Sequence, residues 1–230
     1  MTTVHRFFVQ PEEATGERFP IPPSIRRQAE HVLRLRDGDH VVILTGDGRE
    51  ARCRLEDGDC IVEERREAPG EPSHRLTLVQ ALLKGDGLEH AIQQGTELGV
   101  AAFRLVVSDR CIARDLSPRK LERLNVIARE SAEQAERGLV PDVLAPVPIA
   151  TTLTAGAVLL AERSDGRRLR DLPPPGTVIV GPEGGFSPAE LEAAARNGVE
   201  LAGLGPRILR SRTVAAAVAA SILSRTGDFA

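Results

Sequence analysis

Four short segments carry the residues whose types and spacing could do chemistry. They are KGDG (84–87), ERS (162–164), GPEGGF (181–186) and GLGPRILR (203–210), and each lies at the end of an apolar run of strand length. Glycine permits positive φ and a close approach of the backbone to a ligand, so such turns can bind a cofactor through N–H and C=O groups. For GPEGGF the alternative is a tight strand-to-helix turn without a ligand. A second glycine-rich loop, at 203–210, carries two arginines. Its presence favours a ligand site over a simple turn.

The sequence lacks the motifs that characterise several other kinds of site. KGDG stands where a classical nucleotide-binding fold would carry GxGxxG, and GPEGGF lacks the lysine of a P-loop. The histidines and cysteines show no HExxH or CxxC spacing, so we expect no metal site. No GxSxG motif is present. Cys111 follows a predicted strand and could be a nucleophile, although a buried, inert thiol is the favoured interpretation.

The elements that must position these loops follow an alternating pattern. Short apolar runs lie at 75–83, 101–108, 157–162, 177–181 and 199–205, and helical patterns lie at 87–98, 118–136, 188–197 and 213–225. Continuous apolar strands separated by helices predict an α/β fold with a parallel sheet covered on both faces. Ligands bind beyond the carboxyl ends of such strands. Ser187, Pro188 and Glu190 form a capping-box start for one helix.

The first part of the chain has a different period. Short strands at 40–44, 49–56 and 60–67 are separated by Gly and Asp turns, which predicts a β-meander closed into a small barrel. The segment APGEPSH (68–74) marks a domain boundary. We therefore expect a barrel over 1–70 and an α/β domain over 75–230. The last helix is nearly all alanine and aliphatic, so it should pack within its domain or against a second subunit.

Composition narrows the class of protein without indicating its ligand. The chain has 230 residues, 41% of them hydrophobic, and only three cysteines, which fits a folded protein of one or two domains. No apolar run is long enough to span a membrane, so we expect a soluble, cytoplasmic protein without membrane contact. Of 30 basic residues only Lys84 and Lys120 are lysine, yet the net charge is −3. Any nucleic acid must therefore be bound through a local patch.

Longer motifs carry a resemblance to a known family. The stretches VIVGPEGGFSPAELEAA (178–194) and LGPRILRSRTVAAAVAASIL (204–223) resemble the C-terminal signature of SPOUT-class methyltransferases. More narrowly, the chain is similar to the ribosomal RNA small subunit methyltransferase E family, which methylates N3 of a uridine in 16S rRNA. Further matches are HRFFV (5–9), HVLRLRDGD (31–39), LLKGDGLEHAIQQGTELGV (82–100), SDRC (108–111) and ESAEQAERGLVPDV (130–143).

The resemblance implies a fold, a cofactor and partners. It implies a PUA-like β-barrel followed by a SPOUT α/β domain tied in a trefoil knot, and a homodimer formed through the knot region. It implies S-adenosyl-L-methionine as the cofactor and 16S rRNA in the 30S subunit as the substrate. The implied cofactor-binding residues are Ala161, Glu162, Gly181, Gly184, Gly185, Leu204, Gly205, Ile208 and Leu209.

Catalytic and RNA-binding roles also come from the resemblance. Arg210 ends the RILR motif and is the first candidate for a catalytic contact; it cannot act as a base, but it can stabilise an anion. Glu183 could be a general base, orient the cofactor, or only satisfy loop N–H groups. The RNA-binding candidates are Arg6, Arg34, Lys84, Arg110 and Arg137.

Two positions depart from the family pattern. Arg212 stands where an acid is expected after RILR, and Gly87 stands where lysine is common after KGD. The charge reversal at 212 leaves open a second interpretation, a catalytically impaired RNA-binding or ribosome-assembly protein on the same scaffold. Gly87 removes one cation that could contact phosphate.

Overall fold

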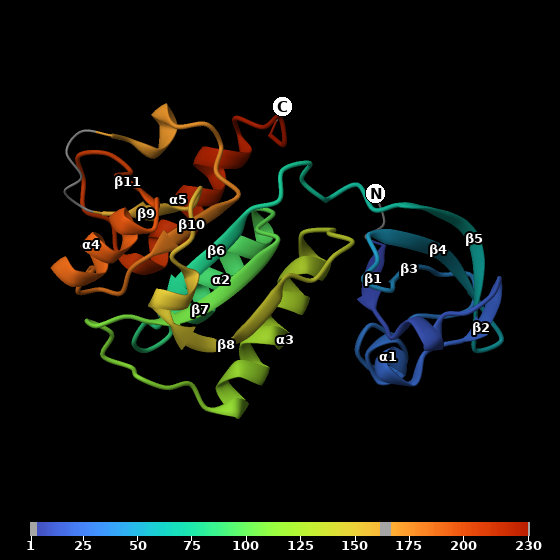
Figure 1. Ribbon diagram of the computed structural model, residues 1–230. Helices are drawn as coiled ribbons and strands as arrows, with labels where there is room; N and C mark the ends of the chain where they lie inside the picture. The colour runs from blue at the N-terminus through green and yellow to red at the C-terminus, as the bar shows by residue number, and fades with distance from the viewer. Residues whose placement is uncertain (1–3, 162–166, 230) are drawn as a thin grey trace. The chain divides into compact units, whose positions relative to one another are not determined.

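The computed structural model describes residues 4–161 and 167–229 (Figure 1). By its internal contacts the chain forms two compact units. The first comprises Met1–Glu71 and Ala132–Val140, and the second comprises Pro72–Ser131 and Pro141–Ala230. The sequence pattern divides the chain only once, within 68–74. The return of residues 132–140 to the first unit is therefore a departure from that expectation.

The first unit is built on a five-stranded sheet with the order β1-β3-β4-β5-β2. The strands are β1 (His5–Phe8), β2 (Arg18–Pro20), β3 (His40–Leu44), β4 (Arg49–Glu56) and β5 (Asp59–Glu67). Only the β1–β3 pair is parallel. A short helix, α1 (Pro23–Arg27), is followed by a π-turn over Gln28–Val32. Alternate residues of the strands point into a buried core that includes Phe7, Phe19, Ile43 and Leu55.

Residues 132–140 complete this unit at the edge of β1. The Glu133 carboxylate accepts a hydrogen bond from Phe8 N at 3.0 Å, so it occupies a donor that β1 would otherwise leave unpaired. Ala132 is fully buried with Phe8, Val42 and Leu44. A Cβ at Gly138 would lie 2.4 Å from the Ala68 Cβ, so this segment packs closely against the end of β5.

Ion pairs reinforce the same edge of the first unit. Glu50 is almost completely buried and pairs with Arg6 and Arg66. Arg6 also pairs with Glu136, so it joins β1 and β4 to the 132–140 segment. The guanidinium of Arg137 is buried and pairs with Glu71, whose Oε1 also accepts a hydrogen bond from Leu139 N. Charges buried in this way stabilise a fold only when each has its partner.

The second unit is a six-stranded sheet with the order β11-β9-β10-β6-β7-β8, and all its pairs are parallel. Its strands are β6 (Thr77–Ala81), β7 (Ala102–Val107), β8 (Asp142–Pro148), β9 (Val158–Leu160), β10 (Thr177–Val180) and β11 (Glu200–Ala202). Its helices are α2 (Gly87–Glu97), α3 (Pro118–Gln134), α4 (Pro188–Arg196) and α5 (Ser211–Leu223), although the last three residues of α3 belong to the first unit. The expected α/β fold with a parallel sheet is confirmed.

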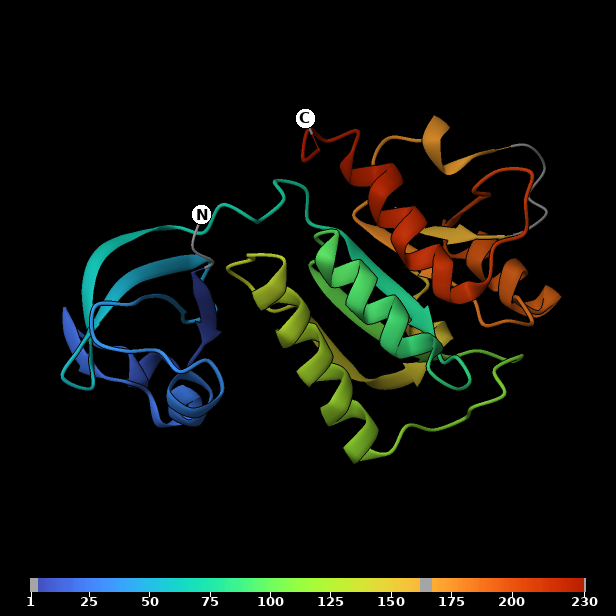
Figure 2. The same cartoon turned by 180° about the vertical axis from the view of Figure 1, so that it is seen from behind.

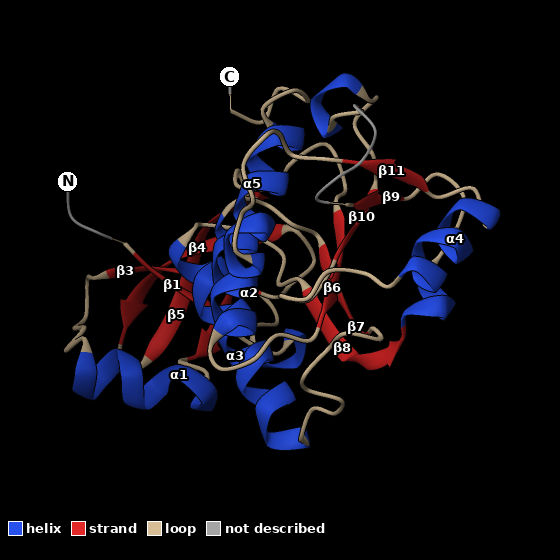
Figure 3. Cartoon of the chain, turned by 90° about the vertical axis from the view of Figure 1, so that its left-hand side faces the viewer, coloured by secondary structure: helices blue, strands red, loops and turns tan. Residues whose placement is uncertain are grey.

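The sheet lies between helices on both faces, with α2, α3 and α5 on one side and α4 on the other (Figure 3). Its central strands are buried apolar runs, as their sequences predict. Helix α5 packs against α2 and β10 and buries Ala215, Val218, Ala219, Ile222 and Leu223. The apolar last helix therefore packs within its own unit along this face.

Glu50 allows a test of the first unit's ion pairs. Burial alone would raise the pKa of Glu50, but hydrogen bonds from Arg6 and Arg66 outweigh it, so the pKa lies below its ordinary value. The ionised carboxylate therefore stabilises the fold above the unfolded pKa of about 4.3, and this stabilisation is lost as pH falls through the folded pKa.

We expect Glu50→Gln to lower the free energy of unfolding by about 3 kcal/mol at neutral pH, because it breaks a buried ion pair. The difference from wild type should shrink as the pH falls below about 4. Urea denaturation followed by circular dichroism measures both. Glu56→Gln, an exposed ion-pair partner on the same strand, should change stability little. A loss at Glu50 that did not vary with pH would contradict the role of its charge.

Candidate functional site

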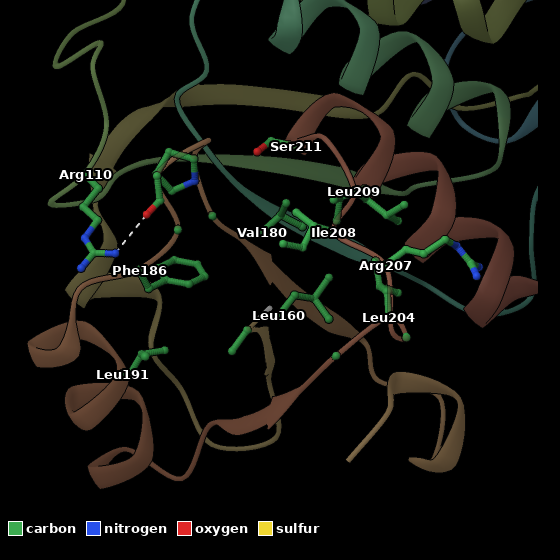
Figure 4. A pocket seen from close by; sticks show the side chains of 18 residues that line it. Arg110, Leu160, Val180, Phe186, Leu191, Leu204, Arg207, Ile208, Leu209 and Ser211 are labelled. Atoms are coloured by element: carbon green, nitrogen blue, oxygen red, sulfur yellow. Dashed lines mark hydrogen bonds between the residues drawn. The ribbon is translucent and has the colours of Figure 1, made fainter. Parts of the chain in front are cut away.

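Two cavities lie at the carboxyl ends of the strands in the second unit. The first has a volume of about 270 Å³ and is lined mainly by the loops that follow β9, β10 and β11 (Figure 4). The second has a volume of about 460 Å³ and is lined by the loop after β6, by Glu183 and by the start of α5. Ile208, Leu209 and Ser211 line both cavities, so the two adjoin along this short segment.

Glycines give the first cavity an exposed backbone. Gly185 has φ +68° and Gly205 has φ +135°, conformations that other residues rarely adopt. A Cβ at Gly205 would meet no heavy atom within 4 Å, so the space beside its backbone is open. At Gly181 a Cβ would lie 3.0 Å from the Phe186 ring, so this glycine lets the ring fold back over the loop. The cavity therefore combines accessible peptide groups with an apolar wall.

The structure brings together the predicted cofactor-binding residues that it describes. Those lining the first cavity are Ala161, Gly181, Gly184, Gly185, Leu204, Gly205, Ile208 and Leu209. Glu162 lies outside the described residues. Phe186, the last residue of the predicted segment 181–186, also lines the cavity. Leu160, Leu191 and Val214 line it too, and the sequence analysis did not select them.

Arg110 belongs to this cavity as well. Its Nη1 donates a hydrogen bond to the Gly184 carbonyl at 3.1 Å (Figure 4), and the aliphatic part of its side chain lies against Gly184. The sequence placed Arg110 among the RNA contacts. Its observed contact instead links the loop after β7 to the glycine-rich loop after β10.

The Glu190 carboxylate makes a second link between these same two loops. Glu190 is buried, its Oε1 accepts from Asp109 N at 2.8 Å, and its Oε2 accepts from Ser187 N at 2.8 Å. Ser187 Oγ in turn accepts from Glu190 N, which completes the predicted capping box at the start of α4. Hydrogen bonds to a charged acceptor are stronger than neutral ones. Together with the hydrogen bond from Ser187 Oγ to Asp109 Oδ2 at 2.5 Å, this carboxylate fixes the loop after β7 to the start of α4.

The two predicted catalytic residues share the second cavity. Arg210 and Glu183 both line it, together with Lys84, Asp86 and Arg212. Lys84 N donates to Glu183 Oε1 at 3.2 Å, which holds the carboxylate at the turn after β6. Its other oxygen has no hydrogen-bond partner among the residues that the structure describes. A carboxylate and a guanidinium thus face the same volume, beside the segment shared with the first cavity.

The remaining RNA-binding candidates divide into two groups. Lys84 and Arg34 are exposed, and Arg34 has φ +56° in the turn after the π-turn. Arg6 and Arg137 are held in ion pairs within the first unit, and Arg137 is 2% exposed. These contacts give Arg6 and Arg137 a role in the packing of that unit, where a buried charge needs its partner. RNA binding by either residue stays a prediction.

Cys111 has the environment of an inert thiol. It is 4% exposed, and burial raises the pKa of its thiol. Within the described ranges, no three His, Cys, Asp or Glu side chains come together in a way that could hold a metal ion. In the same ranges, every helix is too short or too polar to cross a membrane.

Comparison with known proteins identifies the family. The profile described as "RNA methyltransferase domain" matches residues 70–224, and the profile described as "RNA methyltransferase PUA domain" matches residues 31–63. The chain belongs to this RNA methyltransferase family. The ribosomal RNA small subunit methyltransferase E of Synechocystis is 33% identical over 95% of this chain and 77% of its own length. The protein of the same name from Bacillus subtilis is 30% identical over 91% and 92%.

Solved structures of methyltransferases resemble this chain over nearly its full length. The Neisseria gonorrhoeae ribosomal RNA small subunit methyltransferase E, bound to S-adenosyl methionine, superposes with a TM-score of 0.87 at 28% identity and covers 97% of this chain and 98% of its own. A Legionella pneumophila putative methyltransferase with bound cofactor has a TM-score of 0.84 at 25% identity, covering 97% and 98%. The predicted family and the PUA-like and α/β architecture are confirmed.

Removing the Glu190 carboxylate should loosen the two loops that it joins. In Glu190→Ala we expect the amide protons of Asp109 and Ser187 to exchange with solvent about tenfold faster or more, because each loses a hydrogen bond to a charged acceptor. Hydrogen exchange followed by NMR measures this. Glu192→Ala is the matched control, since Glu192 is an exposed carboxylate on the same helix. Unchanged exchange at both amides in Glu190→Ala would refute the link.

Proposed function

We propose that this protein uses S-adenosyl-L-methionine to methylate N3 of a uridine in the 16S rRNA of the small ribosomal subunit. The observation that carries the proposal is the junction of the two cavities at Ile208, Leu209 and Ser211. One cavity offers glycine-rich backbone, and the other presents Arg210 and Glu183. A donor and an acceptor held in adjoining sites satisfy the main geometric requirement of group transfer.

The first cavity fits the cofactor. Peptide groups at Leu204, Gly205, Ile208 and Leu209 would hold the adenine, and Gly181 and Gly184 would admit the ribose and methionine parts. Gly205 supports this assignment because the space beside its backbone is open, and Phe186 and Leu160 supply apolar surface for a ring. The cofactor supplies an electrophilic methyl group on a sulfonium.

The residues of the second cavity suit the acceptor side of the reaction. N3 of uracil carries a proton that must leave, and the resulting negative charge spreads to the flanking carbonyl oxygens. Arg210 would stabilise that charge as a fixed donor. Glu183 would accept the proton through the carboxylate oxygen that lacks a partner among the described residues. Lys84 N, bonded to the other oxygen, keeps the carboxylate in place.

The family resemblance also implies an oligomeric state, a cellular location and a chain topology. We include in the proposal a cytoplasmic homodimer and a trefoil knot in the second unit. Ala216, Ala217 and Ala220 on α5 are only half-buried, and a face of such small residues suits the close approach of a second subunit. Arg225 donates to the carbonyls of Leu169 and Leu172, so the chain after α5 is tied to the segment between β9 and β10.

Arg212 favours the second interpretation, an RNA-binding or assembly protein that has lost catalysis, because it reverses the charge expected after RILR. The two functions are separated by mapping 16S rRNA by mass spectrometry in cells that lack this protein. We expect an unmethylated uridine that becomes N3-methyluridine when their 30S subunits are incubated with the protein and S-adenosylmethionine. If no methyl group is transferred while the 30S subunits are still bound, the second interpretation is correct.

Arg210 allows a test of the catalytic assignment. We expect Arg210→Ala to lower kcat by about 10²- to 10³-fold, the usual effect of removing one donor to a developing anion. Calorimetry should show cofactor affinity within about twofold of wild type, because the side chain lies in the second cavity. Arg196→Ala, an exposed arginine on α4, serves as the control. Full activity in Arg210→Ala would remove this residue from the mechanism.

A further inference from the structure

The second cavity gathers more positive charge than the proposed chemistry uses. The exposed side chains of Lys84, Arg210 and Arg212 all line it. None of the three has a hydrogen bond or an ion pair with another described residue through its side chain. The acidic residues of the lining are Glu183 and Asp86, and the Asp86 carboxylate lies 3.6 Å from His90 Nδ1. Cations left without partners around one cavity favour an anionic ligand.

Two helices also begin at this cavity. Helix α2 starts at Gly87 and α5 at Ser211, and the two helices lie side by side and start at the same end (Figure 2). The N-cap residues are Asp86 and Arg210; the Asp86 carboxylate makes no capping hydrogen bond, and the Arg210 side chain has no acceptor to make one. The free N–H groups and the positive ends of both helix dipoles therefore add to the potential of the three side chains.

We propose that the second cavity binds a phosphodiester group of the RNA next to the methylated uridine, with Lys84 and Arg212 as its ion-pair partners. This inference rests on the proposed function, because the junction at Ile208, Leu209 and Ser211 places the cavity beside the methyl donor. A phosphate held there anchors the nucleotide while Arg210 and Glu183 act on its base. Phosphate contacts of this kind fix position without reading sequence.

The packing around Gly87 leaves little room for a longer side chain there, which fits a cation supplied from position 212. A Cβ at Gly87 would lie 3.0 Å from Leu83 Cβ and 3.1 Å from Leu83 Cδ1, so the start of α2 fits tightly against the preceding turn. A longer side chain at 87 would have to displace Leu83. Arg212 reaches the same cavity from the start of α5. The two departures from the family pattern thus offset each other, since one removes a cation and the other adds one.

The experiment measures binding to 30S subunits purified from cells that lack this protein, over a range of salt concentrations and without methyl transfer. Each lost phosphate contact lowers the slope of log K against log salt by about 0.7 to 0.9. We expect this reduction and at least about tenfold weaker binding in Arg212→Ala. We expect the same for Lys84→Ala, and Arg212→Lys should restore most of the slope.

The matched control is Arg119→Ala, because Arg119 is an exposed arginine at the second residue of α3, as Arg212 is of α5. Its salt slope should equal that of wild type. Arg212→Glu reverses the charge and tests the proposal most directly. From the family pattern alone we expect methyl transfer to be retained or improved. If Arg212 contacts a phosphate, this variant should bind 30S subunits more weakly than Arg212→Ala does.

One other anion could occupy the cavity, the carboxylate of the cofactor's methionine. Calorimetry with S-adenosylmethionine separates the two sources. We expect Arg212→Ala to bind it as wild type does. Weaker cofactor binding with an unchanged salt slope would overturn the proposal, as would a wild-type slope in both Arg212→Ala and Lys84→Ala. Because binding is measured without transfer, a protein that proved catalytically inactive would still reveal the phosphate contact.

Discussion

One buried carboxylate joins two of the loops behind the site. Glu190 accepts hydrogen bonds from the backbone of Asp109 and of Ser187, so it fixes the loop after β7 to the glycine-rich loop after β10. Arg110 strengthens the same link through the Gly184 carbonyl. A glycine-rich loop has many accessible conformations, and ordering it only when a ligand binds would cost conformational entropy. The capping box of α4 orders it in advance, so a single motif both starts a helix and shapes a cavity.

Much of this arrangement could be predicted from the sequence because the signals are local. Ser187, Pro188 and Glu190 predict a helix start, and short apolar runs predict buried parallel strands. The glycines of 181–186 and 203–210 predict loops that approach a ligand, and the structure places both around one cavity. Assigning chemistry to Arg210 and Glu183 required the family resemblance, since spacing alone cannot show that residues from separate loops face the same volume.

The partners of the arginines could not be predicted from the sequence. Arg6, Arg110 and Arg137 all fall in family motifs, yet Arg6 and Arg137 pair with acids of the first unit, and Arg110 supports the cavity loop. Whether a guanidinium is committed to a partner depends on residues distant in sequence, such as Glu50 for Arg6 and Glu71 for Arg137. The packing of residues 132–140 in the first unit could not be predicted for the same reason. It depends on contacts between residues more than a hundred positions apart in the sequence.

Because residues 132–140 belong to the first unit, that unit can be completed only after they have been synthesised. The β-strands of the first unit are complete once Glu67 has left the ribosome, but the edge of β1 and the guanidinium partner of Glu71 are supplied by Glu133 and Arg137. During synthesis the N-terminal sheet must therefore wait, without these partners for Phe8 N and Glu71, while the Pro72–Ser131 part of the second unit emerges. A fragment ending near residue 71 would carry that same exposed edge permanently, and unpaired strand edges promote association with other chains. Completion of the first unit therefore depends on synthesis of part of the second.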